Sequence, residues 1–317
     1  MTDPQRPRAL YTRHGLIKLP AYIPVTTFGG KYPLDDLVRP YLPRLAPAVM
    51  VSMFYAQQMS SRPRLPLLID SGGFASLFAD VKVKAKRGLG VLEMPDGSIT
   101  HPRDVLDFQE EHADVAFTLD FPLPAQLDPE ERVLRQSLTI ANAEWALRNR
   151  RRQDLPLFAC VQGWDPESYR RCALAYAGSA FDGVAIGGLV PRMRDEANFW
   201  AIIDAVRGAV PGLPIHAFGV GKPGIVEALF KRGVQSVDSS SYVKLAASGV
   251  LWGSAGKLPD PSPTDRLHLA LCNLATATGA TMPLSSAQLV FRTQSLVELN
   301  DSSRLNDSSG SSGGPEP

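Results

Sequence analysis

Short apolar runs alternate with longer amphipathic stretches along most of the chain. Buried parallel strands read as continuous apolar runs of roughly four to eight residues bounded by turn residues. Eight runs of this kind follow one another: Ala21–Thr27, Ala48–Phe54, Leu65–Asp70, Asp114–Asp120, Leu157–Gln162, Gly183–Ile186, Ile215–Val220 and Gln235–Asp238.

Helical segments are predicted between the later runs, at Pro102–His112, Asp128–Arg151, Pro166–Ala180, Glu196–Val210 and Pro223–Arg232. Strands that alternate with helices in this way form parallel sheets covered by helices. Eight repeats favour an α/β fold in which the sheet closes into a (β/α)8 TIM-type barrel. A doubly wound open sheet is the second choice.

Two regions depart from the alternation. Residues Asp80–Ser98 interrupt it after the third strand and contain the turn signal Asp96-Gly97, so we expect an excursion or hairpin there on the catalytic face. The pattern weakens after Gly253. We therefore predict a barrel domain over 1–253, a helical C-terminal extension over 254–300 with helices at Asp265–Thr278 and Ser285–Glu298, and a disordered tail over 301–317.

The composition is that of an ordinary globular protein. Of 317 residues, 44% are hydrophobic and 21% are charged, and the net charge of +1 gives no global signal for a nucleic-acid partner. The three scattered cysteines predict neither a disulfide framework nor a cysteine-based zinc site. No signal region or membrane-length run is present, so we expect no membrane association and a cytoplasmic protein.

Candidate site residues follow the ends of the predicted strands. Acidic residues at the carboxyl ends of parallel strands are where a barrel of this kind places its chemistry. The residues predicted at this mouth are Asp70, Ser71, Gly72, Gly73, Asp120, Gln162, Gly163, Gly187, Gly188, Gly219, Val220, Gly221 and Asp238.

These residue types together match the edge of a guanine base. A carboxylate accepts from the ring N–H and the exocyclic amine, while Gln162 and backbone N–H groups donate to the keto oxygen. Phe74 is placed to stack on the base. Two further carboxylates suit a reaction at an anomeric carbon, where one attacks and the other moves protons.

Each piece also has a purely structural interpretation. Asp70 can cap a tight turn, Asp120 can cap the segment that follows it, and Asp238 is a good helix N-cap residue. The glycine pair Gly187-Gly188 can serve turn geometry alone. The occurrence of all these residues together at strand ends is much less expected by chance than the occurrence of any one of them.

Five motifs in order resemble those of the tRNA-guanine transglycosylases, the queuine/archaeosine-type base-exchange enzymes. They are Asp70-Ser71-Gly72-Gly73-Phe74, the strand ending at Asp120, Val161-Gln162-Gly163, the run from Phe181 to Leu189, and Gly219-Val220-Gly221-Lys222-Pro223. The similarity extends from about Leu19 to Gly253 and implies a barrel fold.

The resemblance implies a ping-pong exchange that replaces guanine in a nucleic acid with a 7-deazaguanine through a covalent glycosyl-enzyme. Asp238 would be the nucleophile and Asp70 the general acid/base. Asp120, Gln162 and the backbone of Gly187–Leu189 would read the base. Ser71, Gly72, Phe74 and Gly219 would complete the pocket. No cofactor is implied, and a homodimer is compatible with the family.

The chain departs from the family's usual pattern in two places. The family carries a zinc site of the form C-x-C-x-x-C with a distant His, whereas Cys272 stands alone here, so no metal is expected. The family also follows its nucleophile with Cys-Val-Leu-Pro-Thr-Arg, where this chain has Ser239-Ser240-Ser241-Tyr242-Val243-Lys244. Both segments help the family to hold tRNA, so the target stays open between tRNA and DNA.

Two other functions compete with base exchange. A non-catalytic subunit that binds a partner transglycosylase is less favoured, because Asp70 and Asp238 are both present. An ordinary barrel glycosidase or nucleosidase is also less favoured, since a simple hydrolase needs no guanine-reading Gln162.

Overall fold

The structure, a computed structural model, describes residues 7–28 and 32–280. Its centre is a parallel sheet of eight strands in the order β3-β13-β12-β11-β10-β9-β5-β4. The strands are β3 (Ala21–Pro24), β4 (Val49–Val51), β5 (Leu67–Ile69), β9 (Val115–Phe117), β10 (Leu157–Val161), β11 (Gly183–Ile186), β12 (Ile215–Ala217) and β13 (Ser236–Ser239). They coincide with the eight predicted runs, in the predicted order, and only β13 extends beyond its run, by one residue to Ser239.

The first and last strands of this sheet approach each other, so the sheet is nearly closed. Val25, just after β3, forms a parallel bridge with Met50 in β4, and the backbone N–H of Thr26 donates to the Met50 carbonyl at 2.9 Å. The prediction of a (β/α)8 barrel is therefore confirmed.

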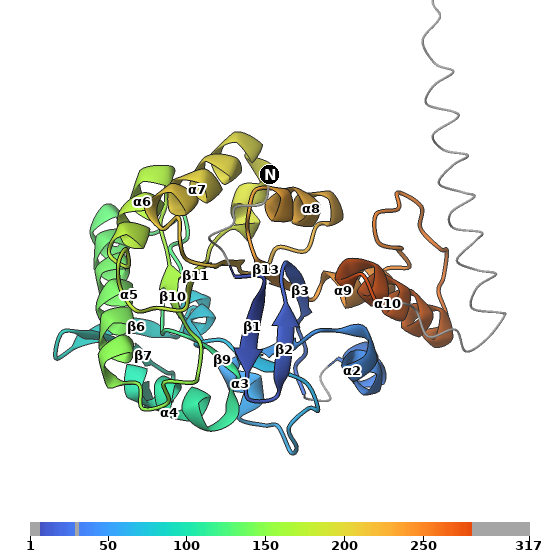
Figure 1. Ribbon diagram of the computed structural model, residues 1–317, viewed down its shortest axis with the longest axis horizontal. Helices are drawn as coiled ribbons and strands as arrows, with labels where there is room; N and C mark the ends of the chain where they lie inside the picture. Colours follow the sequence, from blue (N-terminus) through green and yellow to red (C-terminus); the bar gives the residue numbers. More distant parts are fainter. Residues whose placement is uncertain (1–6, 29–31, 281–317) are drawn as a thin grey trace, which may run out of the picture.

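Helices surround the strands (Figure 1). The five predicted helices are present: α4 (Pro102–His112), α5 (Pro129–Asn149), α6 (Pro166–Leu174), α7 (Glu196–Ala209) and α8 (Pro223–Lys231). Their ends differ from the prediction by at most two residues, except that α6 ends six residues before the predicted Ala180. Shorter helices, which the sequence pattern did not reveal, lie at α1 (Pro33–Val38), η1 (Arg39–Tyr41), α2 (Leu42–Leu45), α3 (Met53–Ala56), η2 (Gly73–Leu77), η3 (Val190–Arg194) and α9 (Ser241–Ala247).

An N-terminal hairpin of β1 (Ala9–Thr12) and β2 (Gly15–Lys18) precedes the first barrel strand and was not predicted. It lies in front of the strand ring in Figure 1. Ile17 of this hairpin is buried in one cluster with interior side chains of the barrel, among them Ile23, Met50 and Phe117. The hairpin therefore packs onto the interior of the barrel, and a second, larger core fills the space between strands and helices.

The predicted excursion is a three-stranded antiparallel sheet of β6 (Lys82–Lys86), β7 (Leu89–Glu93) and β8 (Ile99–Thr100). Asn142 of α5 holds it in place by exchanging hydrogen bonds with the backbone of Gly90, at 2.9 and 3.1 Å. The hairpin prediction is confirmed. The sheet packs against α5, however, and none of its described residues lines the cavity at the barrel mouth.

Helix α10 (Pro263–Thr278) corresponds to the first helix predicted in the C-terminal extension. Its buried face, with Leu269 and Leu274, joins the same core as Tyr22 and Leu42. The predicted helix Ser285–Glu298 and the tail 301–317 lie outside the described residues, and the proposed domain boundaries stay predictions. Among the helices described, none has both the length and the apolar character needed to cross a bilayer.

Candidate active site

The carboxyl ends of the barrel strands surround a cavity of about 290 Å³. Ten of the eleven predicted catalytic and base-binding residues line it: Asp70, Ser71, Phe74, Asp120, Gln162, Gly187, Gly188, Leu189, Gly219 and Asp238. They follow or end six different strands, from β5 round to β13. The fold therefore brings together residues that are far apart in the sequence.

Among the predicted catalytic and base-binding residues, Gly72 does not line the cavity, and neither do Gly163, Val220 and Gly221, which were also predicted at the barrel mouth. The φ of +72° at Gly72 places it in the left-handed region, where a side chain would be strained. Its backbone N–H donates to Oδ1 of Asp70 at 2.9 Å. Gly72 therefore supports the turn that holds Asp70, and it is not in the pocket itself.

The Asp70 carboxyl follows β5 and is held by backbone groups. In addition to Gly72, the N–H of Met53 donates to its Oδ1 at 3.0 Å. The pKa of Asp70 is raised to about 6: burial is the largest cause, the negative charges of Asp120 and Asp238 add to the increase, and the two backbone hydrogen bonds oppose it. A carboxyl with a pKa near 6 can both give and take a proton close to neutral pH.

The Asp120 carboxylate is held by two side chains of the cavity wall. Ser71 Oγ donates to Oδ1 at 2.7 Å, and Gln162 Nε2 donates to Oδ2 at 2.6 Å. Burial raises the pKa of Asp120, and these two hydrogen bonds oppose the increase. Both carboxylate oxygens keep further acceptor capacity, since an ionised carboxylate has about four lone-pair sites.

The amide of Gln162 is used differently from the expectation. We expected its N–H group to face a ligand keto oxygen, but that group donates to Asp120, and the buried Oε1 has no hydrogen-bond partner among the described residues. A buried polar atom without a partner is costly, so a ligand that donates to Oε1 would gain binding energy. Gly187 makes this arrangement possible, because a Cβ there would lie 2.1 Å from Gln162 Nε2.

The loop from Gly187 to Leu189 is held by two side chains that the sequence analysis did not single out. Tyr169 of α6 donates to the Gly187 carbonyl at 2.8 Å. The Arg192 guanidinium, at the cavity wall, donates to the carbonyls of Gly188 and, at 3.0 Å, Gly163. These contacts fix the backbone that follows β11 against the backbone that follows β10.

Asp238 in β13 is held by His216, a residue that the sequence analysis did not single out. Its Oδ1 accepts from His216 Nε2 at 3.0 Å and from the backbone N–H of Gly219 at 3.0 Å. No hydrogen bond from the residues that the structure describes engages Oδ2. The carboxylate is only 7% exposed, yet it lines the cavity, so Oδ2 is the oxygen open to a ligand.

The aromatic side chain of Phe74 lines the cavity and is largely exposed. Phe74 is 63% exposed and contacts Phe78 edge-to-face, with ring centroids 6.1 Å apart. An exposed aromatic ring that lines a cavity suits the stacking of a base. The expected role of Phe74 as a stacking residue stays a prediction.

The described residues contain no group of three or more His, Cys, Asp or Glu side chains arranged to hold a metal ion. Cys272 and His268 lie one turn apart on α10, with Sγ and Nε2 at 3.5 Å. The sequence expectation that the chain carries no metal stays a prediction.

A change in the stability of the protein with pH tests the environment of Asp70. The folded state raises the pKa of this carboxyl from 3.8 to about 6, so the unfolded chain loses the proton first and ionisation at this position destabilises the fold as pH rises. Asp70→Asn should remove this cost and gain about 2 kcal/mol more in unfolding free energy at pH 8 than at pH 4.5.

Urea unfolding at the two pH values measures this difference. Asp80→Asn, at an exposed position, is the matched control and should show little dependence on pH. An equal effect of Asp70→Asn at both pH values would mean that the carboxyl is not desolvated in the fold.

Comparisons with known proteins point to one family. Residues 44–284 match the family model described as queuine tRNA-ribosyltransferase. The chain is 29% identical to the queuine tRNA-ribosyltransferase of Moorella thermoacetica, over 78% of this chain and 71% of that protein. It is also 29% identical to the one of Cereibacter sphaeroides, over 92% and 83%.

A more distant relative carries a different name. The tRNA-guanine(15) transglycosylase of Methanothermobacter thermautotrophicus is 26% identical over 78% of this chain and 37% of that protein. All the cavity residues from Asp70 to Asp238 lie inside the region matched by the family model.

Proposed function

Because the chain belongs to the queuine tRNA-ribosyltransferase family, a family of pentosyltransferases, we propose that it exchanges a guanine in a nucleic acid for a 7-deazaguanine base. The proposed nucleic acid is tRNA, the substrate in the names of its relatives. The observation that carries the proposal is one cavity with three carboxylates in three different environments.

The first proposed step is attack at the sugar. Asp238 Oδ2 forms a bond to the anomeric carbon C1′, and the bond from C1′ to the guanine nitrogen breaks. The leaving base takes the electron pair and accepts a proton from Asp70. The product is a covalent glycosyl-enzyme together with free guanine, as in the first half of a retaining glycosidase reaction.

The second proposed step reverses the first with a different base. The incoming 7-deazaguanine gives its ring proton to the ionised Asp70, and its nitrogen forms the new bond to C1′. The ester bond between C1′ and Asp238 breaks, and the carboxylate is released. Asp70 suits both steps, because burial sets its pKa at about 6, where a proton moves easily in either direction.

Recognition of the base is proposed to depend on Asp120. Its two oxygens face the cavity between Ser71 and Gln162 and can accept from the ring N–H and exocyclic amine of guanine. Gln162 Oε1 can accept a further N–H, and Gly188 and Leu189 also line the cavity. Phe74 would cover the base from the mouth of the cavity.

Asp120→Asn should weaken guanine binding more than it slows the chemistry. The amide replaces one acceptor oxygen with an N–H group, which cannot accept from the base and faces the N–H of Gln162 or the hydroxyl of Ser71. We expect the KM for guanine to rise about 10- to 100-fold, with a smaller change in kcat. Steady-state exchange of labelled guanine measures both values. An unchanged KM would remove Asp120 from base recognition.

The proposed function is tested by offering labelled guanine and unmodified tRNA to the purified protein. Label in the tRNA supports base exchange. Release of guanine from tRNA without any incorporation would instead indicate a hydrolase. Absence of both reactions would favour a non-catalytic subunit.

A further inference from the structure

His216 is a buried histidine directly beneath the proposed nucleophile. It lies in β12, is 1% exposed, and packs against both Phe117 and Phe218, with ring centroids 5.2 and 4.9 Å away. A lone histidine in an apolar strand is usually a core residue. Here, however, both ring nitrogens have polar partners on the neighbouring strand β13.

The hydrogen bonds determine the orientation and tautomer of the ring. An ionised carboxylate can only accept, so the contact of 3.0 Å between His216 Nε2 and Asp238 Oδ1 places a proton on Nε2. In the neutral ring, Nδ1 is then an acceptor, and the hydroxyl of Ser236 donates to it at 2.8 Å. The resulting chain of contacts is Ser236, His216 and Asp238, all buried.

We propose that His216 is the positioning residue for the nucleophile of the base-exchange reaction. Its Nε2–H and the N–H of Gly219 both bind Oδ1 of Asp238, which fixes the plane of the carboxylate. Oδ2 is then the oxygen that attacks C1′. Both donors bind the carboxylate in a site shielded from water, where a small displacement of the attacking atom is costly.

This inference rests on the proposed function, because it assumes that Asp238 attacks the sugar. It adds a residue that does not line the cavity and an assignment of the attacking oxygen. The aromatic packing around the ring supports the same role, since it prevents His216 from turning away from Asp238.

Two substitutions at His216 separate positioning from packing. Gln can place an amide N–H near the position of Nε2, whereas Met fills the space without a donor. His216→Met should lower kcat for guanine exchange about 100-fold and leave the KM values for guanine and tRNA within about twofold. His216→Gln should restore kcat to within about tenfold of the wild type.

Two further variants complete the test. Met50→Leu changes another side chain of the barrel interior and should leave kcat unchanged. Ser236→Ala removes the donor to Nδ1 without opening the aromatic packing, and should lower kcat several-fold with unchanged KM. If either His216 variant fails to fold, Ser236→Ala still tests the positioning role of His216.

The inference is overturned if His216→Met folds and keeps the wild-type kcat, or if His216→Gln is as slow as His216→Met. It is also overturned if Ser236→Ala keeps the wild-type kcat. Failure of the proposed function is a different result, since the wild-type protein itself would then show no exchange.

Discussion

Replacing Asp238 by asparagine should lower guanine exchange by about 10⁴-fold or more, because it removes the atom that forms the covalent bond. Asparagine has nearly the same shape, so the barrel should keep its fold. Its amide, however, is a poor nucleophile. In the wild type a carboxylate oxygen accepts the N–H of His216, whereas in the variant an amide N–H can face that donor instead. Both effects act on the chemical step.

Two readouts measure the result. Incorporation of labelled guanine reports the overall rate, and a protein–nucleic acid adduct that survives denaturing electrophoresis reports the glycosyl-enzyme. The wild-type protein and Asp80→Asn, a change at an exposed carboxylate, should give both signals. Exchange at the wild-type rate by Asp238→Asn would mean that another group attacks the sugar.

Replacing Asp114 by asparagine should lower the free energy of unfolding by about 3 kcal/mol, since it leaves a buried ion pair without its anion. Asp114 is fully buried at the start of β9 and binds three groups from different parts of the chain. Its carboxylate accepts from His14 Nδ1 at 2.7 Å, from Leu67 N at 2.8 Å, and from the Arg62 guanidinium.

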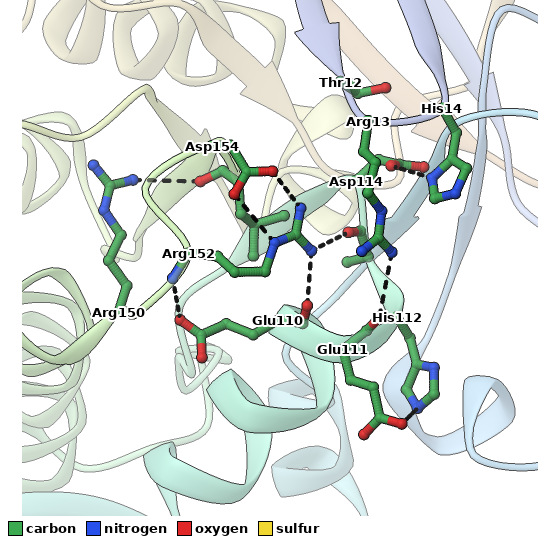
Figure 2. Close-up of polar contacts among 12 residues, drawn as sticks. Thr12, Arg13, His14, Glu110, Glu111, His112, Asp114, Arg150, Arg152 and Asp154 are labelled. Atoms are coloured by element: carbon green, nitrogen blue, oxygen red, sulfur yellow. Dashed lines mark hydrogen bonds and ion pairs between the residues drawn. The ribbon is translucent and has the colours of Figure 1, made fainter.

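This carboxylate connects the N-terminal hairpin to the barrel. His14 lies in the turn between β1 and β2, and Figure 2 shows it pointing at Asp114 beside a network of arginines and acids. In the same network Arg152 pairs with the exposed Asp154 at 2.8 Å. Because Asp114 lies at the amino end of a barrel strand, away from the mouth, its role is expected to be stability.

Asp154→Asn is the matched control. Its side chain is 64% exposed, so its ion pair should contribute less than about 1 kcal/mol. Urea unfolding followed by circular dichroism compares the two variants, while guanine exchange under native conditions should change little in either. Equal stabilities of the two variants would show that burial of Asp114 adds nothing to its ion pairs.

The sequence pattern predicted the strands well and the short elements poorly. Continuous apolar runs such as Leu157–Gln162 indicate buried parallel strands when they recur between helices. The hairpin β1–β2 has only four residues per strand, and its turn at Arg13-His14 carries no glycine–asparagine signal. Helices α1 and α2 lie in a proline-rich stretch, where short helical turns leave no periodic pattern.

Site residues near the end of an apolar run could be predicted from the sequence. A site residue deeper within such a run could not. Asp70 and Asp120 follow apolar runs and are visible in the sequence. His216 lies within the run Ile215–Val220, and nothing in the sequence pairs it with Asp238. Gln109 of α4 donates to the carbonyls of Ile69, Asp70 and Phe117, at 3.0, 3.2 and 2.9 Å, a contact that only the folded chain reveals.

Incorporation of labelled guanine into a nucleic acid is the most direct measurement of base exchange by this protein. The purified protein is offered labelled guanine with unmodified tRNA in one reaction and duplex DNA in another, with Asp238→Asn as the blank. We expect label in the tRNA. Label in the DNA alone would keep the chemistry and correct the substrate, whereas no label in either nucleic acid would show that the protein does not exchange guanine.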